Sequence, residues 1–240
     1  MIFSRRGILC AGMTIIFSVS TLGQLPLVRE EQPVMVDGAE EVWRLTWKSA
    51  PKPFCDDETL APTCPCNGFA YGERGDLDLV RLRRGIEIDR LNLTPLFKGT
   101  DGIISVTEDE AAVQRAGHII HFGDYNHDGL ATEFFLQTDA KPCGKHYGVV
   151  LGVTKGNPRA HPFGTVAHPD IPLSMEFDAW EELRTSTWPV EIVDWHCDDH
   201  GSDEQVEFKL TWSPKGIDGV RRTYACAGNV RGKLLSEAPL

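Results

Sequence analysis

The chain has 240 residues, of which 41% are hydrophobic and 25% are charged, a balance typical of a globular protein with a sizeable core. This composition excludes a wholly disordered chain and leaves room for one large domain or two small ones. The formal net charge of −11 argues against nucleic-acid binding, for which a basic face is expected.

The first 23 residues have the pattern of an export signal. Arg5 and Arg6 form a short positive region, and the apolar run from Ile8 to Val19 is too short for a comfortable membrane span. We therefore predict a signal peptide over residues 1–23 and a periplasmic or extracellular mature protein, with no stable membrane span after cleavage. An uncleaved N-terminal anchor is the main alternative.

The cysteines support the same compartment. Of the seven cysteines, one lies in the predicted signal and six remain, an even number that favours disulfides in an exported chain. The spacing does not choose among the pairings, although Cys55 with Cys64 or Cys66, and Cys197 with Cys226, are reasonable. A metal or redox site at Cys64 and Cys66 is the alternative, but it lacks a second dithiol at zinc spacing. The disulfide candidates are Cys55, Cys64, Cys66, Cys143, Cys197 and Cys226.

After the signal, the chain divides into a short arm and one domain. Residues 24–41 are polar and contain Pro26 and Pro33, so we predict a linker or an extended arm there. Residues 42–240 are predicted to form a single disulfide-bonded, β-rich domain. Within it, residues 50–68 hold several prolines and three of the cysteines, which indicates a cross-linked loop.

Two short helices are expected in this domain. Thr107 and Glu110 have the spacing of a capping box, in which each side chain bonds a backbone N–H of the first turn, and Gly117 can end that helix. A second helix is predicted to start at Asp178 and to run through Leu183. Neither is long enough to organise the fold.

The remaining pattern is that of short strands. Apolar and polar residues alternate with a period of two, and glycines and prolines separate the segments, which favours antiparallel sheets. We therefore predict a mostly β fold, irregularly propeller-like or sandwich-like, with a loop or edge over 154–172 and a hairpin turn over 214–219. The expected strands are 42–47, 69–71, 77–82, 86–93, 118–122, 134–138, 147–153, 190–195, 206–212 and 220–226.

The most informative motif is an acidic loop. Asp124, Asn126 and Asp128 stand at alternate positions and Gly129 follows, a spacing by which one tight loop wraps oxygen ligands around Ca²⁺. The alternative is a hairpin turn that is rich in Asp, Asn and Gly for conformational reasons alone. The predicted ligands of a structural calcium ion are the side chains of Asp124, Asn126, Asp128 and Glu133 and the backbone carbonyl of Leu130.

Residues 122–137 carry a family resemblance. Gly123-Asp-Tyr-Asn-His-Asp-Gly129, followed by apolar Phe134-Phe-Leu136, resembles the calcium loop of FG-GAP and VCBS-type repeats, which build β-propeller blades in integrin-like and bacterial surface proteins. The resemblance implies calcium ligands at the three alternate residues and at the backbone of Leu130. It departs from the family where an acid is usual, because Thr132 stands there and Glu133 comes one residue later.

The sequence does not specify a reaction. It contains neither the Gly-x-Ser-x-Gly of serine hydrolases nor a glycine-rich phosphate loop. We therefore expect a binding or surface interaction module with an unknown protein or glycan ligand. The alternative is a secreted metal-dependent hydrolase that uses a histidine-rich second loop, made of His196, Asp198, His200 and Asp203.

Overall fold

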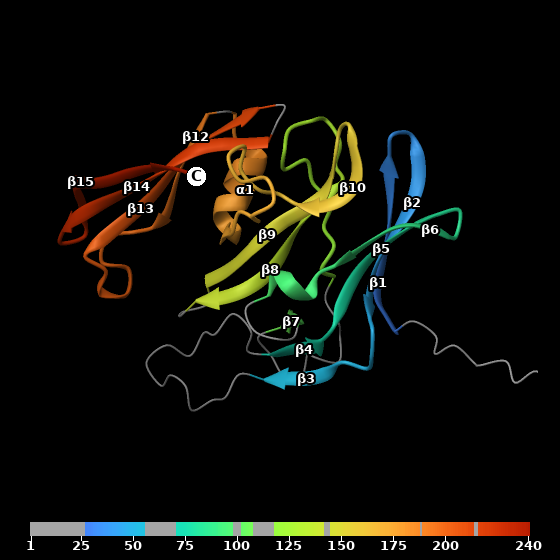
Figure 1. Ribbon diagram of the computed structural model, residues 1–240. Helices are drawn as coiled ribbons and strands as arrows, with labels where there is room; N and C mark the ends of the chain where they lie inside the picture. The colour runs from blue at the N-terminus through green and yellow to red at the C-terminus, as the bar shows by residue number, and fades with distance from the viewer. Residues whose placement is uncertain are drawn as a thin grey trace, which may run out of the picture.

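The computed structural model describes residues 27–55, 71–97, 102–107, 118–141, 145–187, 189–213 and 216–240. In this part of the chain, three antiparallel four-stranded sheets follow one another in sequence, as Figure 1 shows from blue to red. A three-stranded sheet and one α-helix complete the described structure. The mostly β, antiparallel fold that the sequence predicts is therefore confirmed. The predicted signal over 1–23 lies outside the described residues.

The first sheet has the strand order β1-β2-β5-β6. Trp43, Leu45 and Trp47 lie on one face of β2 and are buried, as the alternation predicts. Asp37 and Gly38 have positive φ angles and form the two-residue turn that joins β1 to β2. The strands are β1 (Leu27–Val36), β2 (Ala39–Trp47), β5 (Leu77–Arg83) and β6 (Ile86–Asn92).

The linker or arm predicted over 24–41 is wrong for most of its length, because residues 27–36 form β1 and pair with β2. Its polar composition has a physical reason. The strand lies at the edge of the sheet and alternates between covered and exposed positions. Pro33 is tolerated there, since an edge strand does not need every N–H for pairing.

The second sheet is centred on β9 (Lys145–Thr154), which has β8 on one side and both β10 and β11 on the other. The strand β9 is buried on both faces over most of its length. Gly148 allows the close approach of β8, since a Cβ there would stand 2.2 Å from the carbonyl oxygen of Leu136. The other strands are β8 (Glu133–Lys141), β10 (Asn157–Pro162) and β11 (Met175–Glu176).

The third sheet has the order β12-β13-β14-β15, and its last strand is absent from the sequence prediction. All ten residues of β15 are exposed, and its pairing with β14 shifts register twice. The predicted turn over 214–219 is shorter in the structure, because Gly216 already pairs with Ser213. The strands are β12 (Val190–Trp195), β13 (Glu204–Ser213), β14 (Gly216–Ala227) and β15 (Val230–Pro239).

The smaller elements surround these sheets. The helix α1 (Phe177–Thr185) confirms the second predicted helix, and it buries Ala179, Trp180 and Leu183. The first predicted helix lies mostly outside the described residues, and Thr107, its predicted start, ends β7. No described helix has the length and apolar character needed to cross a membrane. The remaining elements are the three-stranded sheet of β3 (Lys52–Cys55), β4 (Tyr71–Gly75) and β7 (Gly102–Thr107), and the 3₁₀ turns η1 (Thr94–Leu96) and η4 (Asp199–Gly201).

Two hydrophobic cores hold the three large sheets together as layers. The first lies between the β1-β2-β5-β6 sheet and one face of the second sheet, where Val149, Leu151 and Val153 point. The second lies on the opposite face, where Val150 meets α1 and the third sheet. Figure 1 shows α1 between β9 and the β12–β15 sheet. The strand β9 is therefore the shared wall of both cores.

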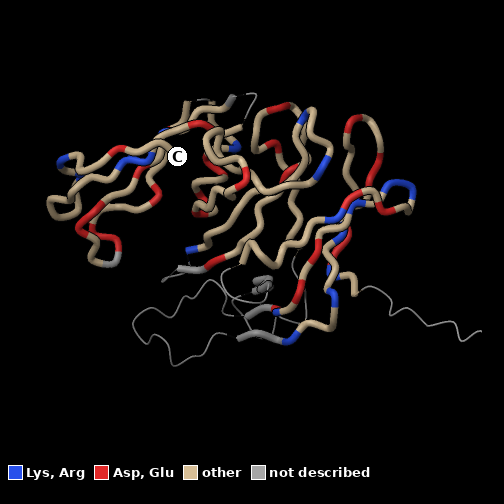
Figure 2. Tube along the Cα trace, viewed as in Figure 1, with Lys and Arg blue, Asp and Glu red and all other residues tan. Residues whose placement is uncertain are grey.

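A buried ion pair joins the adjacent strands β2 and β5 of the first sheet. Glu41 and Arg81 are both 1% exposed, and Arg81 donates from Nε to Glu41 Oε2 at 2.9 Å and from Nη2 to Oε1 at 3.1 Å. Glu41 also accepts from Trp43 Nε1 at 3.0 Å and from Arg83 Nη2 at 2.6 Å. Asp89 Oδ2 lies 3.3 Å from Arg81 and accepts the backbone N–H of Ala160, which links this sheet to β10. Figure 2 shows acidic and basic residues interspersed along the described strands.

Segment 118–122 is not the strand that the sequence predicts. Its only described ladder contact is at the adjoining Gly123, which forms an isolated bridge with Glu133. The reason is the buried carboxylate of Glu30 on β1, which accepts the backbone N–H groups of Ile119 at 2.6 Å and of Ile120 at 3.2 Å. A side chain therefore satisfies the N–H groups that a neighbouring strand would otherwise bond.

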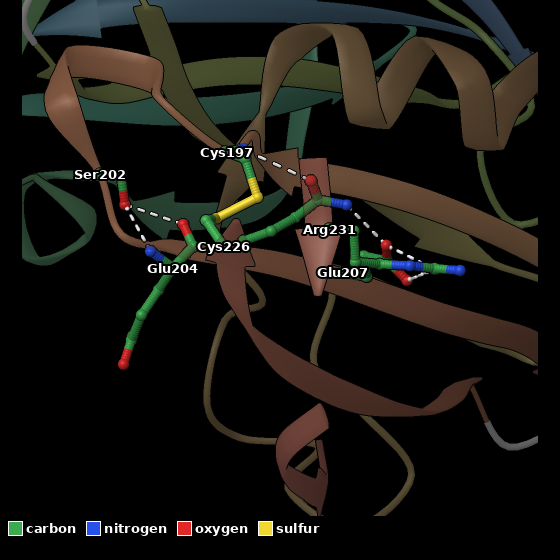
Figure 3. Close-up of a disulfide and its surroundings, with 7 residues drawn as sticks. Cys197, Ser202, Glu204, Glu207, Cys226 and Arg231 are labelled. Carbon is green, nitrogen blue, oxygen red and sulfur yellow. Dashed lines mark hydrogen bonds and ion pairs between the residues drawn. A yellow bond between two sulfur atoms is a disulfide. The ribbon is translucent and has the colours of Figure 1, made fainter. Parts of the chain in front are cut away.

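One disulfide lies in the described part of the chain, between Cys197 and Cys226, with a Cα–Cα distance of 5.6 Å (Figure 3). It confirms one of the pairings considered above. The two cysteines do not sit on adjacent strands, because β13 lies between β12 and β14. Gln205 on β13 accepts the N–H of Cys197 at 3.4 Å. Cys64, Cys66, Cys143 and the side chain of Cys55 lie outside the described residues.

Candidate functional site

The acidic loop is closed at its base by backbone pairing. Gly123 and Glu133 exchange two hydrogen bonds, of 2.8 and 3.2 Å, and the residues between them turn back sharply. Asp124 stabilises this turn, since its carboxylate accepts the N–H of Asp128 at 3.1 Å and of Gly129 at 3.0 Å. Gly129 has a φ of +87°, a left-handed conformation that suits glycine.

Asp128 ties the loop to the neighbouring hairpin. One carboxylate oxygen accepts the N–H of Leu130 at 2.9 Å, and the other accepts the N–H of Lys155 at 2.7 Å. Asn126 is fully buried, and its amide nitrogen lies 3.2 Å from Asp128 Oδ2 and 3.3 Å from Glu133 Oε1. The loop therefore gathers the four side chains that the sequence predicts as ligands.

Glu133 is the most deeply buried of these carboxyl groups, at 0% exposure. It accepts from Thr132 Oγ1 at 3.0 Å and from the N–H of Tyr125 at 3.1 Å. Burial, with a smaller contribution from the charges of Asp128 and Asp124, raises the pKa of Glu133 to about 9. Of the ion pairs among the described residues, none involves Asp124, Asp128 or Glu133.

This geometry does not by itself amount to a metal centre. The described part of the chain contains no group of three or more His, Cys, Asp or Glu side chains arranged to hold a metal ion. The loop oxygens instead accept the hydrogen bonds given above. The calcium ion therefore stays a prediction for Asp124, Asn126, Asp128, Leu130 and Glu133.

Gly123 and Tyr125 of the acidic loop line a cavity of about 640 Å³. Its other walls are the segment that begins at His118, the strand β8 and the helix α1. Aromatic side chains dominate, and Phe135 and Phe177 pack edge to face at 5.1 Å. Phe177 is 40% exposed and lines the cavity. The residues that make the cavity aromatic are Phe122, Tyr125, Phe135 and Phe177.

One end of this cavity is polar. Tyr125 donates from its hydroxyl to Glu181 Oε1 at 2.7 Å, and Arg184 Nε lies 3.1 Å from each oxygen of the same carboxylate. The hydrogen bond from Arg184 holds the pKa of Glu181 below its ordinary value. Burial, followed by the neighbouring Glu181, raises the pKa of Tyr125. At neutral pH the end therefore presents a neutral phenol beside a paired carboxylate and guanidinium.

Three histidines stand around the cavity, and each already has a partner. His118 lies 3.3 Å from Glu30, His121 lies 3.1 Å from the carbonyl oxygen of His118, and His146 lies 2.9 Å from Gln137 Oε1. They add polarity to an apolar space. No described trio of His and acidic side chains forms a metal centre here.

The second acidic loop has a different organisation. Asp198 has a φ of +64°, and its N–H donates to the carbonyl oxygen of Ser202 at 3.0 Å. Asp199 pairs with Lys145 at 2.8 Å, and the Lys145 ammonium stands 4.8 Å above the ring of Trp195. His196 is exposed, and the side chain of His200 lies outside the described residues. Backbone bonds, the Ser202 hydroxyl, the ion pair of Asp199 and the Cys197–Cys226 disulfide hold this loop.

The cavity residues are not among the predicted site residues. Tyr125 stands between two predicted ligands of the acidic loop, and Glu181 lies inside the second predicted helix. The available signal was the spacing of Glu181 and Arg184, which places them on one face of a helix as an ion pair. Their approach to Tyr125, which is 56 residues from Glu181 in the sequence, depends on the packing of the second core.

The chain was compared with protein-family models, with curated proteins and with solved structures. None of these three comparisons found a match. The cavity and the acidic loop are therefore the features from which a function can be inferred.

Proposed function

We propose that this protein is an exported binding module that holds a small, largely apolar molecule in the cavity beside α1. The observation that carries the proposal is the cavity itself, which is about 640 Å³ in volume and is lined by four aromatic rings with one polar end. Concave, mostly apolar spaces with a few convergent polar groups are the usual form of small-molecule sites.

The polar end indicates how the ligand is oriented. Glu181 and Arg184 neutralise each other, so this pair offers no net charge to a ligand. The phenol of Tyr125 and the half-exposed carboxylate can still accept or donate single hydrogen bonds. An uncharged molecule with an aromatic or alkyl body and one polar group fits this arrangement best.

Calcium is part of the same proposal, as a structural ion in the acidic loop. Glu133 supports it, because this carboxyl is buried beside two further carboxylates and no described cation pairs with it. A bound Ca²⁺ would supply the missing positive charge. Tyr125 depends on the same loop, since its N–H donates to Glu133, so the ion would also fix one wall of the cavity.

The proposed export has one independent support. The Cys197–Cys226 disulfide is of the kind that persists in oxidising compartments and is rare in the cytosol. A periplasmic or extracellular binding protein is therefore the proposal that agrees with both the cavity and the cross-link.

The test is a titration of the oxidised, signal-free protein with the neutral apolar probe N-phenyl-1-naphthylamine, in the presence of Ca²⁺. We expect saturable binding that Phe177→Ala weakens about tenfold, since truncation of a central aromatic contact typically costs more than 1 kcal/mol. Ile86→Ala is the matched control, because Ile86 is 70% exposed on β6 and does not line the cavity. Equal binding by the parent and the Phe177 variant would contradict the proposal.

A further inference from the structure

A second cavity, of about 810 Å³, lies against the same acidic loop. Asp128 lines this second cavity, whereas Gly123 and Tyr125 line the first. Its other walls come from the β9–β10 turn at Lys155, from residues 161–170 and from Trp212 on β13. It is therefore a separate space with its own lining.

Aromatic rings form part of this wall. Phe163 is buried, and its ring lies 5.5 Å from that of His161. Trp212 follows the buried residues Phe208 and Leu210 on the same face of β13, and it is only partly covered by the second core. Trp212 therefore stands at the border between the second core and the wall of this cavity.

The rest of the lining is polar and mixed in charge. Lys155 and Asp170 are exposed and bring opposite charges, and Asp128 adds a second carboxylate. Asn157 and His161 contribute an amide and an imidazole, 3.4 Å apart. Such a lining disfavours a purely apolar ligand, because it would leave these groups without partners. It also disfavours a strongly charged ligand, because either sign would meet a like charge.

We propose that this second cavity is a binding site for a neutral carbohydrate. A sugar ring has an apolar C–H face that can lie on an aromatic ring, whose face is electron-rich, and hydroxyl groups around its edge. Hydroxyls both donate and accept, so they can use the carboxylate of Asp170, the amide of Asn157 and the N–H of Trp212 together. The site is independent of the apolar ligand proposed for the first cavity.

The experiment is isothermal titration calorimetry of the oxidised protein with Ca²⁺ present. The probes are neutral oligosaccharides of glucose, galactose, mannose and N-acetylglucosamine, and adenosine tests the competing class of aromatic nucleosides. We expect at least one oligosaccharide to bind with a stoichiometry of one and adenosine not to bind. Failure of every oligosaccharide, or binding of adenosine alone, would overturn the proposal.

Two variants locate the binding. Trp212→Ala should abolish the heat signal, and Asp170→Ala should weaken affinity about tenfold, the typical effect of losing a hydrogen bond to a charged group. Asp170 is exposed, so its variant keeps the test decisive even if Trp212→Ala does not fold. Asp178→Ala is the control, since Asp178 is exposed on α1 and lines neither cavity. Unchanged sugar binding by Asp170→Ala and Trp212→Ala would place the sugar elsewhere.

Discussion

Glu41 and Glu133 are both almost completely buried, but their surroundings differ. Glu41 is contacted by the guanidinium groups of Arg81 and Arg83 and by the indole of Trp43. Glu133 is contacted by a hydroxyl, a backbone N–H and an amide, and its nearest charged neighbours are two further carboxylates. The chain therefore provides a cation for the first carboxylate and provides none, among the described residues, for the second.

This difference separates a buried carboxylate that the chain pairs with a cation from one that has no described cation beside it. A buried carboxylate without a positive partner becomes protonated or recruits a metal ion. The first core illustrates a complete network and the acidic loop an incomplete one. Two experiments test this comparison. One removes Arg81, the cation beside Glu41, and the other adds Ca²⁺ to the loop that contains Glu133.

The largest expected effect is at Arg81. Arg81→Ala leaves Glu41 buried with only the half-exposed Arg83 as a cation, so we expect unfolding free energy to fall by about 3 kcal/mol. Urea denaturation followed by circular dichroism measures this. Lys209→Ala, which breaks the exposed pair with Glu191, is the control and should cost about 0–1 kcal/mol. A loss at Arg81 no larger than this would mean that the buried pair contributes little.

The next effect concerns the ion itself. If Ca²⁺ occupies the acidic loop, saturating calcium should raise stability by about 2.7 kcal/mol at a hundredfold excess over Kd. Asp124→Ala and Asp128→Ala should each reduce that gain together with the calcium affinity. Thermal melts after chelation and after addition of Ca²⁺ measure both. The same melting temperature with and without Ca²⁺ in the parent protein would remove the calcium proposal and leave an ordinary turn.

Glu133→Gln in the chelated protein tests the calcium-free state, and its effect is measured as a change in the pH dependence of stability. The pKa of Glu133 is raised from 4.5 to about 9 in the folded chain. Between these two pH values the folded chain therefore keeps a proton on Glu133 that the unfolded chain releases. The stability of the calcium-free parent should therefore fall as pH rises from about 5 towards 9. The variant cannot titrate there, so its stability should vary less with pH. Parallel pH profiles from chemical denaturation would contradict the raised pKa.

Much of the β structure could be predicted from local pattern. Trp43, Leu45 and Trp47 alternate with polar residues and are all buried, because β2 has one face on the core. The strand β15 has no such alternation. Its residues are exposed on both faces, so no periodic apolar signal arises and only its pairing with β14 defines it. The alternation of apolar and polar residues that predicts a strand therefore arises only where one face of the strand is buried.

The site was predictable only in part, for a related reason. The hydrogen bonds that the carboxylates of Asp124 and Asp128 accept within the loop span a few residues, so spacing alone indicates a loop of this kind. The contacts of Glu30 with Ile119 and of Tyr125 with Glu181 join residues that are 89 and 56 positions apart. Such contacts are produced by the packing of layers, and a single sequence carries no local trace of them.

The open edge at β15 bears on how the protein behaves at high concentration. An uncovered strand normally offers a row of free N–H and C=O groups that can template pairing with another chain, and aggregation follows. Here the register shifts opposite Thr223 to Cys226 place extra residues on β15, and Pro239 stands near its end. Bulges of this kind twist and interrupt the row. The exposed Leu234 and Leu235 therefore lie on an edge that is poorly suited to extending the sheet into a second molecule.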